Sequence, residues 1–249
     1  MYQFFVEPSQ INVSTKRVVI EGSDVNHIKN VLRMHSGEEI AVSNGTDGKE
    51  YRCQIRNLGD TIECELLFIK EDAVELPAKI YLFQGLPKGD KMETIIQKAV
   101  ELGVYCVVPV SMKRCVMKLD EKKAKNKITR YNAIAEAAAK QSKRAVIPQV
   151  ENVCNVKEAI NIARGLDVVF VPYEMAEDMT KTREIMETIK PGQSIGFFVG
   201  PEGGIAPEEI QLFEAEQFEE ITLGKRILRT ETAGMTVLSW LVYLLEGKE

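Results

Sequence analysis

The chain has 249 residues, 45% hydrophobic and 28% charged, with a formal net charge of −5, which fits one large or two modest globular domains and argues against a protein coated in nucleic acid. Five cysteines without a C-x-x-C pair and only two histidines argue against a disulfide framework or a metal site, so we expect no metal. No apolar stretch is as long as a membrane span and the first residues do not resemble a signal peptide, so we expect a cytoplasmic protein without membrane contact.

The first seventy residues are typical of short strands. Apolar and polar residues alternate between Asn-Gly and Gly-Asp turn signals, which predicts a small antiparallel barrel or meander. The expected strands are residues 2–6, 17–21, 39–44, 50–58 and 61–71, and a short helix is expected over 24–34. The acidic stretch 71–78 is the candidate linker, so we predict one domain over residues 1–72 and a second over 73–249.

Beyond this linker, strands alternate with helices, which predicts a mostly parallel sheet with helices on both faces. The expected strands are residues 79–86, 105–110, 167–172, 194–200 and 219–224. The expected helices are residues 90–103, 120–141, 155–164, 179–188, a helix from Pro207, and 231–246. The last helix is apolar on nearly all sides, so we expect part of it to contact another subunit.

Three loops follow strands of this predicted sheet, at the edge where open parallel sheets bind ligands. They contain residues 172–174, 200–204 and 223–234, and their glycines allow backbone groups to approach a ligand closely. A phosphate is disfavoured, because no phosphate-loop motif is present and Glu202 stands inside the glycine-rich loop. A cationic ligand or a neutral ring that forms hydrogen bonds fits better, and a tight turn without a ligand is the alternative.

The loop before the last helix carries the cations Lys225, Arg226 and Arg229, and Thr230 or Thr232 can cap that helix. A larger basic block lies upstream, since residues 113–144 contain 11 Lys and Arg against 3 Asp and Glu. Such a block in an acidic protein is typical of a contact surface for an anionic polymer. A solvated helix face without a partner is the alternative.

Five segments resemble a known family. They are "HIKNVLRMHSGEEI" at 27–40, "KGDKMETIIQKAVELGV" at 88–104, "KQSKRAVIPQV" at 140–150, "GPEGG" at 200–204 and "LGKRILRTETA" at 223–233. Together they resemble the RsmE family, bacterial methyltransferases that modify N3 of a uridine in 16S ribosomal RNA with S-adenosylmethionine. The resemblance spans essentially the whole chain.

Two departures from the family pattern are visible. Ile205 and Ala206 stand where the family commonly has Phe-Thr or Phe-Ser, so a hydroxyl helix cap is missing, a loss of about 0.5–2 kcal/mol of local stability. Lys140 and Lys143 replace a Glu and a Gly of the family pattern and only add positive charge.

The resemblance implies an α/β fold, namely a SPOUT-type domain with a knotted parallel sheet preceded by a small PUA-like β-barrel domain. It also implies a homodimer with active sites at the subunit interface, and 16S rRNA or the small ribosomal subunit as partner. The residues then expected to hold S-adenosylmethionine are Pro172, Tyr173, Glu174, Gly200, Pro201, Glu202, Gly203, Gly204, Leu223, Gly224, Ile227, Leu228 and Thr230.

The implied chemistry is an in-line displacement in which N3 of uracil attacks the methyl carbon. Deprotonated uracil carries negative charge on its two carbonyl oxygens, and a guanidinium aimed at them would stabilise the transition state. Arg229 is the candidate for this task, with Arg226 or Arg144 from across the dimer as alternatives. Glu231 and Glu202 are the candidate bases, although either can instead be a helix cap or a turn former.

RNA binding is expected to divide between the basic block and the first domain. The candidates are Arg33, Lys113, Arg114, Lys140, Gln141, Lys143, Arg144 and Arg226. Phosphate contacts of this kind supply affinity and salt dependence without sequence reading. Two other functions stay open, namely a SPOUT methyltransferase acting on a ribose 2′-hydroxyl or on transfer RNA, and an RNA-binding protein without catalysis.

Overall fold

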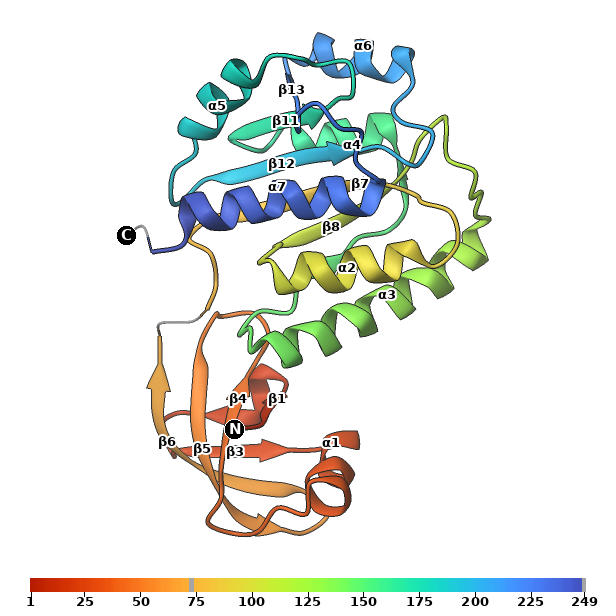
Figure 1. Cartoon of the computed structure of the whole chain (residues 1–249). Helices are drawn as coiled ribbons and strands as arrows, with labels where there is room; N and C mark the ends of the chain where they lie inside the picture. Colours follow the sequence, from red (N-terminus) through yellow and green to blue (C-terminus); the bar gives the residue numbers. More distant parts are fainter. Residues whose placement is uncertain (72–73, 248–249) are drawn as a thin grey trace. The chain divides into compact units, whose positions relative to one another are not determined.

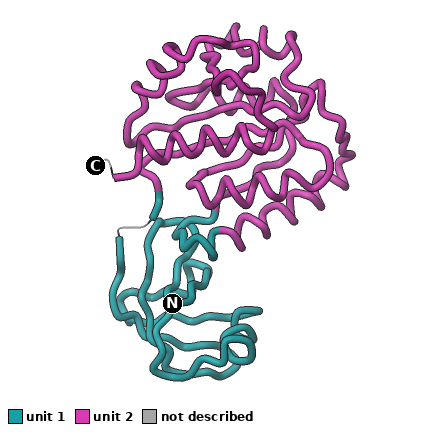
Figure 2. Tube along the Cα trace, in the orientation of Figure 1, with its two compact units in different colours: residues 1–75, 139–147 teal, residues 76–138, 148–249 magenta. Residues whose placement is uncertain are grey.

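The computed structural model describes residues 1–71 and 74–247, and the chain forms two compact units. The first unit contains residues 1–75 and 139–147, and the second contains residues 76–138 and 148–249 (Figure 2). The predicted domain boundary between residues 72 and 73 lies outside the described residues. The segment 139–147 thus returns to the first unit from the middle of the second.

The first unit is built on a six-stranded sheet with the order β1-β4-β5-β6-β3-β2. Its strands are β1 (Gln3–Phe5), β2 (Ile11–Asn12), β3 (Arg17–Ile20), β4 (Glu39–Ser43), β5 (Glu50–Leu58) and β6 (Ile62–Lys70). All pairs are antiparallel, as predicted, except that β1 runs parallel to β4. The sheet curls around a core that includes the buried side chains of Val18, Ile20, Ile40, Ile55 and Ile62 (Figure 1).

The helix predicted over residues 24–34 has a different geometry. It begins as the α-helical turn α1 (Ser23–Asn26) and continues as the π-helical turn η2 (His27–Val31). A separate 3-10 turn, η1 (Pro8–Gln10), lies between β1 and β2. The wider π turn places Ile28 in the core of the sheet, where it is fully buried.

The second unit contains a seven-stranded sheet in which every pair is parallel, as predicted. Its strands are β7 (Lys79–Gly85), β8 (Cys106–Ser111), β9 (Gln149–Val150), β10 (Cys154–Asn155), β11 (Val168–Pro172), β12 (Ser194–Val199) and β13 (Glu219–Ile221). The order is β10-β8-β7-β12-β11-β13, and β9 also pairs with β8. The two-residue strands β9 and β10 are not indicated by the sequence pattern, because two residues carry no measurable periodicity.

The helices of this unit confirm the predicted alternation. They are α2 (Lys91–Glu101), α3 (Glu121–Ser142), α4 (Val156–Ala163), α5 (Met179–Glu187), α6 (Pro207–Ala215) and α7 (Thr230–Leu245). Helices α2 and α7 pack against one another over one face of the sheet, and α4 lies on the other face (Figure 1). The last four residues of α3 belong to the first unit.

Stacked aromatic rings fix β12 in the centre of the sheet. Phe198 stacks on Phe83 of β7 with ring centroids 4.4 Å apart, and it contacts Phe213 of α6 at 4.6 Å. These rings are fully buried. They hold the carboxyl end of β12, and with it the loop that begins at Gly200, in a defined position.

Helix α7 has one covered side and one open side. Val237, Leu238, Leu241 and Leu245 are buried. Tyr243 is 87% exposed, and Trp240 is only partly buried. The helix that the sequence predicts to be apolar all round therefore presents apolar surface away from the core of this chain.

Candidate functional site

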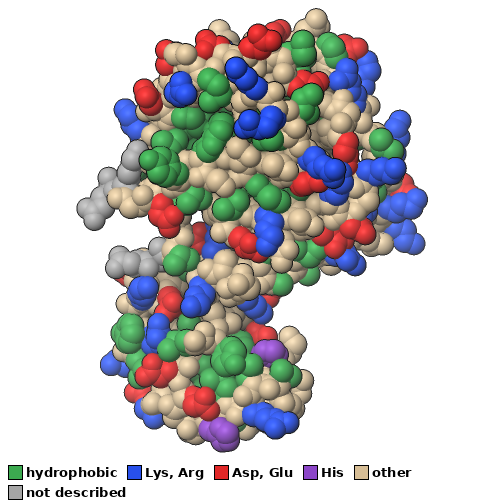
Figure 3. Space-filling view, in the orientation of Figure 1, with side chains coloured by type: hydrophobic (Ala, Val, Ile, Leu, Met, Phe, Trp, Pro, Cys, Tyr) green, Lys and Arg blue, Asp and Glu red, His purple; other side chains and the backbone are tan. Residues whose placement is uncertain are grey.

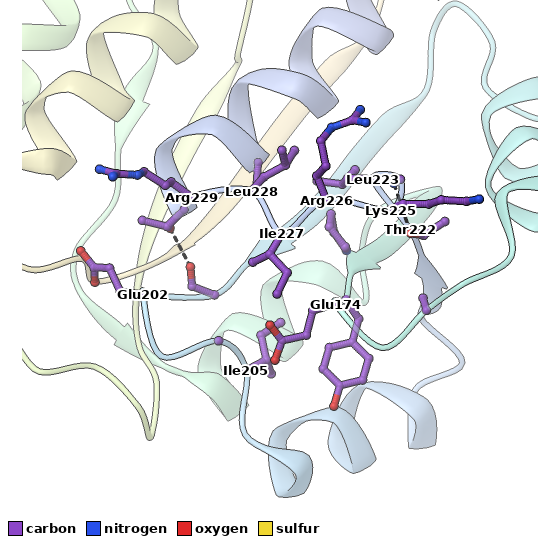
Figure 4. Close-up of a pocket in the computed structure, with 18 of the residues that line it drawn as sticks. Glu174, Glu202, Ile205, Thr222, Leu223, Lys225, Arg226, Ile227, Leu228 and Arg229 are labelled. Atoms are coloured by element: carbon purple, nitrogen blue, oxygen red, sulfur yellow. Dashed lines mark hydrogen bonds between the residues drawn. The ribbon is translucent and has the colours of Figure 1, made fainter.

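A pocket of about 940 Å³ lies at the carboxyl ends of β11, β12 and β13 in the second unit. Its walls come from residues 172–179, 200–205 and 222–230, so the three predicted loops meet in one place. Arg229 and Glu202 stand at one end, whereas Glu174 lies between Ile205 and Ile227 (Figure 4). The volume lies in the range of sites for nucleoside-sized ligands.

Most of the sequence-predicted site residues line this pocket. Among the residues predicted for catalysis or cofactor binding, the exceptions are Gly203 and Glu231, each of which has a chain neighbour that lines it. Arg226, which we expected to bind RNA, is a lining residue. Residues that were not named as cofactor contacts also line it, namely Lys91, Ala176, Glu177, Met179, Ile205, Thr222, Lys225 and Ala233.

The first two residues of the glycine-rich loop are tightly enclosed by protein atoms. The carbonyl oxygen of Gly200 accepts a hydrogen bond from the Thr230 hydroxyl at 2.7 Å. A Cβ atom at Gly200 would lie 2.9 Å from the side chain of Ile205, and one at Gly85 would lie 2.7 Å from Pro201. Glycine at both positions is therefore required by packing within the chain.

Glu202 is anchored by the segment that leads into α2. Its Oε1 lies 2.8 Å from Nζ of Lys91, and its carboxylate oxygens accept the Lys88 amide at 3.1 and 3.2 Å. Burial alone would raise the pKa of Glu202, but the hydrogen bonds from Lys91 and from backbone amides outweigh burial and hold this pKa below its usual value. The hydrogen bond to Glu202 in turn raises the pKa of Lys91. Both groups are charged at neutral pH, so Glu202 ties the loop to α2.

The last two glycines of the loop face a cation and a carboxylate of the same unit. Nη1 of Arg114 donates to the carbonyl oxygen of Gly203 at 2.9 Å, and a Cβ at Gly203 would lie 3.1 Å from the Cβ of Arg114. Gly204 has φ +71°, and a Cβ there would lie 3.3 Å from Oε1 of Glu174. The predicted RNA contact Arg114 therefore clamps the loop in this structure.

Only one half of a capping box is present at the start of α6, because Glu209 binds back to the amide of Ala206 but Ala206 has no side-chain oxygen to accept the Glu209 amide. Oε2 of Glu209 accepts the Ala206 amide at 3.0 Å, and its Oε1 accepts the Lys113 amide at 2.7 Å. Nζ of Lys113 also lies 2.6 Å from Glu208. Ile205 and Ala206 are 3% and 2% exposed, so the apolar pair that departs from the family pattern packs into the core instead.

The start of α7 differs from the predicted cap. Arg229 occupies the N-cap position, and no side chain caps the helix. Thr230 is the first helical residue, and its hydroxyl points to the Gly200 carbonyl instead. Oε2 of Glu231 is buried without a hydrogen-bond partner and lies 3.7 Å from Nζ of Lys91.

Arg144 is enclosed within the first unit. It is 3% exposed, and its guanidinium pairs with Glu75 through Nε at 3.1 Å and Nη2 at 2.5 Å. Glu75 also accepts the amides of Ala145 and Val146 at 3.1 and 3.2 Å. An RNA contact by Arg144 would require this pair to open.

The other predicted RNA contacts of the first unit lie at its surface. Arg33, Gln141 and Lys143 are exposed, whereas Nζ of Lys140 lies 3.4 Å from Asp24. In the second unit, Lys and Arg side chains gather along the edge where α3 begins (Figure 3). The exposed lysines there that have no ion-pair partner among the described residues are Lys118, Lys122 and Lys125.

The pocket suits a ligand that combines a cation with a ring. The carboxylates of Glu174 and Glu177 line it without hydrogen bonds to other described residues, and they can receive a positive group. Ile227 and Leu228 supply apolar contact area, and Ile227 is 85% exposed. S-adenosylmethionine, which carries an adenine, a sulfonium and an ammonium, fits this set of groups.

Within residues 1–71 and 74–247, no helix has the length and apolar character needed to cross a membrane. The same ranges contain no group of three or more His, Cys, Asp or Glu side chains that could hold a metal ion.

Comparison with known proteins places the chain in a family. Residues 74–242 match a model described as an RNA methyltransferase domain, and residues 20–69 match one described as an RNA methyltransferase PUA domain. The "Ribosomal RNA small subunit methyltransferase E" of Bacillus subtilis is 36% identical, over 99% of this chain and 98% of the relative. The protein of the same name from Mesomycoplasma hyopneumoniae is 32% identical, over 96% and 98%.

Among solved structures, the Neisseria gonorrhoeae protein of the same name, bound to S-adenosyl methionine, has a TM-score of 0.82 and 31% identity, with 98% of each chain covered. The predicted fold class is confirmed as a SPOUT-type α/β methyltransferase domain preceded by a PUA-like domain whose sheet forms a half-barrel. The threading of the knot stays a prediction. From its matched domains and its full-length relatives, we conclude that this chain belongs to the RsmE family of RNA methyltransferases.

Proposed function

We propose that this chain transfers the methyl group of S-adenosylmethionine to N3 of a uridine in 16S rRNA. The observation that carries the proposal is the convergence of three loops, from the carboxyl ends of β11, β12 and β13, into one pocket of about 940 Å³. Its free carboxylates and apolar wall suit the cofactor that the Neisseria gonorrhoeae relative binds. When bound, this cofactor supplies an electrophilic methyl group.

Arg229 is the residue that we propose for the uracil. It lines one end of the pocket at the N-cap of α7, and its side chain is exposed. A guanidinium there can donate to the carbonyl oxygens on which negative charge develops as N3 loses its proton. The geometry favours a loop-anchoring role for Glu202, since its carboxylate already binds Lys91, and Glu231 lies outside the pocket wall.

We also propose that the chain acts in the cytoplasm as a homodimer on the small ribosomal subunit or its RNA. The partly exposed apolar side of α7, with Trp240 and Tyr243, supports a subunit contact. The unpaired lysines where α3 begins support phosphate contacts, and the PUA-domain match over residues 20–69 supports RNA binding by the first unit.

The test is mass mapping of methylated nucleosides in 16S rRNA from cells with and without the gene. Loss of one N3-methyluridine in the deletion strain, restored by the wild-type gene, is the expected result. Loss of a ribose 2′-O-methyl group or of a transfer-RNA mark would reject the proposed reaction. In parallel, titration calorimetry with S-adenosylmethionine should show binding, and its absence would favour an RNA-binding protein without catalysis.

A further inference from the structure

A buried glutamine lies behind the pocket at the end of the central strand β7. Gln84 is 0% exposed, although the strand around it is otherwise apolar toward the core. Its Nε2 donates to the Thr230 hydroxyl at 2.9 Å and to the carbonyl oxygen of Gly85 at 2.9 Å. Gln84 does not line the pocket, whereas Thr230 and Gly200 do.

The direction of these hydrogen bonds is fixed by the carbonyls at both ends. The oxygens of Gly200 and Gly85 can only accept, so the Thr230 hydroxyl must donate its single proton to Gly200, at 2.7 Å. The hydroxyl oxygen can then only accept from Gln84, and the amide group of Gln84 must face both Thr230 and Gly85. The result is a chain of donors from Gln84 through Thr230 to Gly200.

This series of hydrogen bonds leaves Oε1 of Gln84 buried without a hydrogen-bond partner among the described residues, near Gly234 of α7. An unpaired buried acceptor is unfavourable, and a residue that only filled this space would be better replaced by an apolar side chain of the same volume. The glutamine is therefore explained by what its amide protons hold in place.

We propose that Gln84 is a positioning residue which, through Thr230, fixes the Gly200 carbonyl and thereby the cofactor loop. The proposal rests on the proposed use of S-adenosylmethionine. It also means that the Thr230 hydroxyl has no proton left to donate to the cofactor, so Thr230 acts through the loop and not as a hydrogen-bond donor to the ligand.

The experiment compares wild type with Gln84→Met, Thr230→Val, the double variant and Thr230→Ser. Thr236→Val is the matched control, since the Thr236 hydroxyl bonds only within α7, to the Thr232 carbonyl. Calorimetry measures the affinity for S-adenosylmethionine and for S-adenosylhomocysteine, and steady-state assays separate KM from kcat. Melting temperatures of the ligand-free proteins report folding.

Each single variant should weaken the binding of both ligands about tenfold and raise the KM for the cofactor, with kcat and the KM for RNA within about twofold. The double variant should also lose about tenfold in ligand affinity, because both changes break the same series of hydrogen bonds. Thr230→Ser keeps the hydroxyl and should bind within about twofold of wild type, as should the control.

Wild-type affinity in Thr230→Val and Gln84→Met would overturn the inference, as would losses that multiply in the double variant. Should those variants not fold, Thr230→Ser and Gln84→Asn decide. A loss in Thr230→Ser, or none in Gln84→Asn, whose shorter amide cannot reach Thr230, would overturn it. Failure of the wild type to bind S-adenosylmethionine would instead reject the proposed function.

Discussion

Replacing Gly85 by alanine tests how tightly the cofactor loop is held. Gly85 is the last residue of β7, and an added Cβ would lie 2.7 Å from Cδ and 2.8 Å from the backbone nitrogen of Pro201. It would also lie 3.0 Å from Sδ of Met112, which can move. The ring and backbone of Pro201 cannot rotate away, so the loop itself must shift.

Inserting one methyl group into a packed site of this kind destabilises a protein by about 1–3 kcal/mol. For a chain of this length, each kcal/mol lowers the melting temperature by about 2–4 °C. Because Pro201 lines the pocket, the displaced loop should also bind S-adenosylmethionine about tenfold more weakly, measured well below the melting temperature. Thermal unfolding and titration calorimetry supply the two numbers.

The matched control is Gly165→Ala in the same unit. A Cβ at Gly165 would lie 3.7 Å from the carbonyl oxygen of Ile162, an ordinary contact, and its φ lies outside the left-handed region. This variant should keep the wild-type affinity and melt at the same temperature or slightly higher. Wild-type behaviour of Gly85→Ala would refute the tight enclosure of the loop, and a lower melting temperature with unchanged affinity would refute its link to cofactor binding.

Three other predictions follow from charges. Replacing Lys118, Lys122 and Lys125 together by Ala should reduce the slope of log RNA affinity against log salt concentration by about 2, at about 0.7 per phosphate contact, with cofactor affinity unchanged. An unchanged slope in filter-binding assays would mean that the RNA phosphates bind elsewhere. Arg144→Met should lower the free energy of unfolding by about 3 kcal/mol in urea, because its partner carboxylate is left without a counter-ion; a stability equal to wild type would contradict a structural pair. Glu202 has a pKa below its usual 4.5, so its ion pair with Lys91 is complete above that pH and is lost as the pH falls through the lower pKa of the folded protein. Cofactor affinity should therefore stay level from neutral pH to about 5 and drop only below about 4.5. A drop near pH 6 in calorimetry would point to another group.

The periodicity of the sequence was sufficient for the order and type of most elements. The apolar runs of β7, β11 and β12 and the helical period of α2 are long enough to identify each element alone. The π turn at His27–Val31 was not foreseeable, because an α-helix and a π turn share nearly the same apolar spacing over five residues. The parallel pairing of β1 with β4 depends on contacts between distant segments, which local patterns do not encode.

The site was only partly predictable, because several of its side chains pair with residues far away in the sequence. Three loops could be placed at one sheet edge by topology alone, but Lys91 looked like an ordinary cation at a helix start until its distance to Glu202 was known. From the sequence, Arg144 was counted as surface charge in the basic block. In the folded protein it is buried and paired with Glu75, 69 positions earlier in the chain. The one available signal for Gln84 was a lone amide in an apolar central strand.

The glycines of the cofactor loop take on a different meaning in the folded chain. From the sequence, they appeared as gaps through which a ligand could approach the backbone. In the structure, the space beside Gly203 is taken by Arg114, and the space beside Gly200 by Ile205. Protein atoms thus pack closely against the loop, while Pro201, Glu202 and Gly204 still line the pocket. A loop held in this way loses little conformational freedom when a ligand binds. The affinity of the pocket for its ligand should therefore depend on the residues that hold the loop in place as much as on those that contact the ligand.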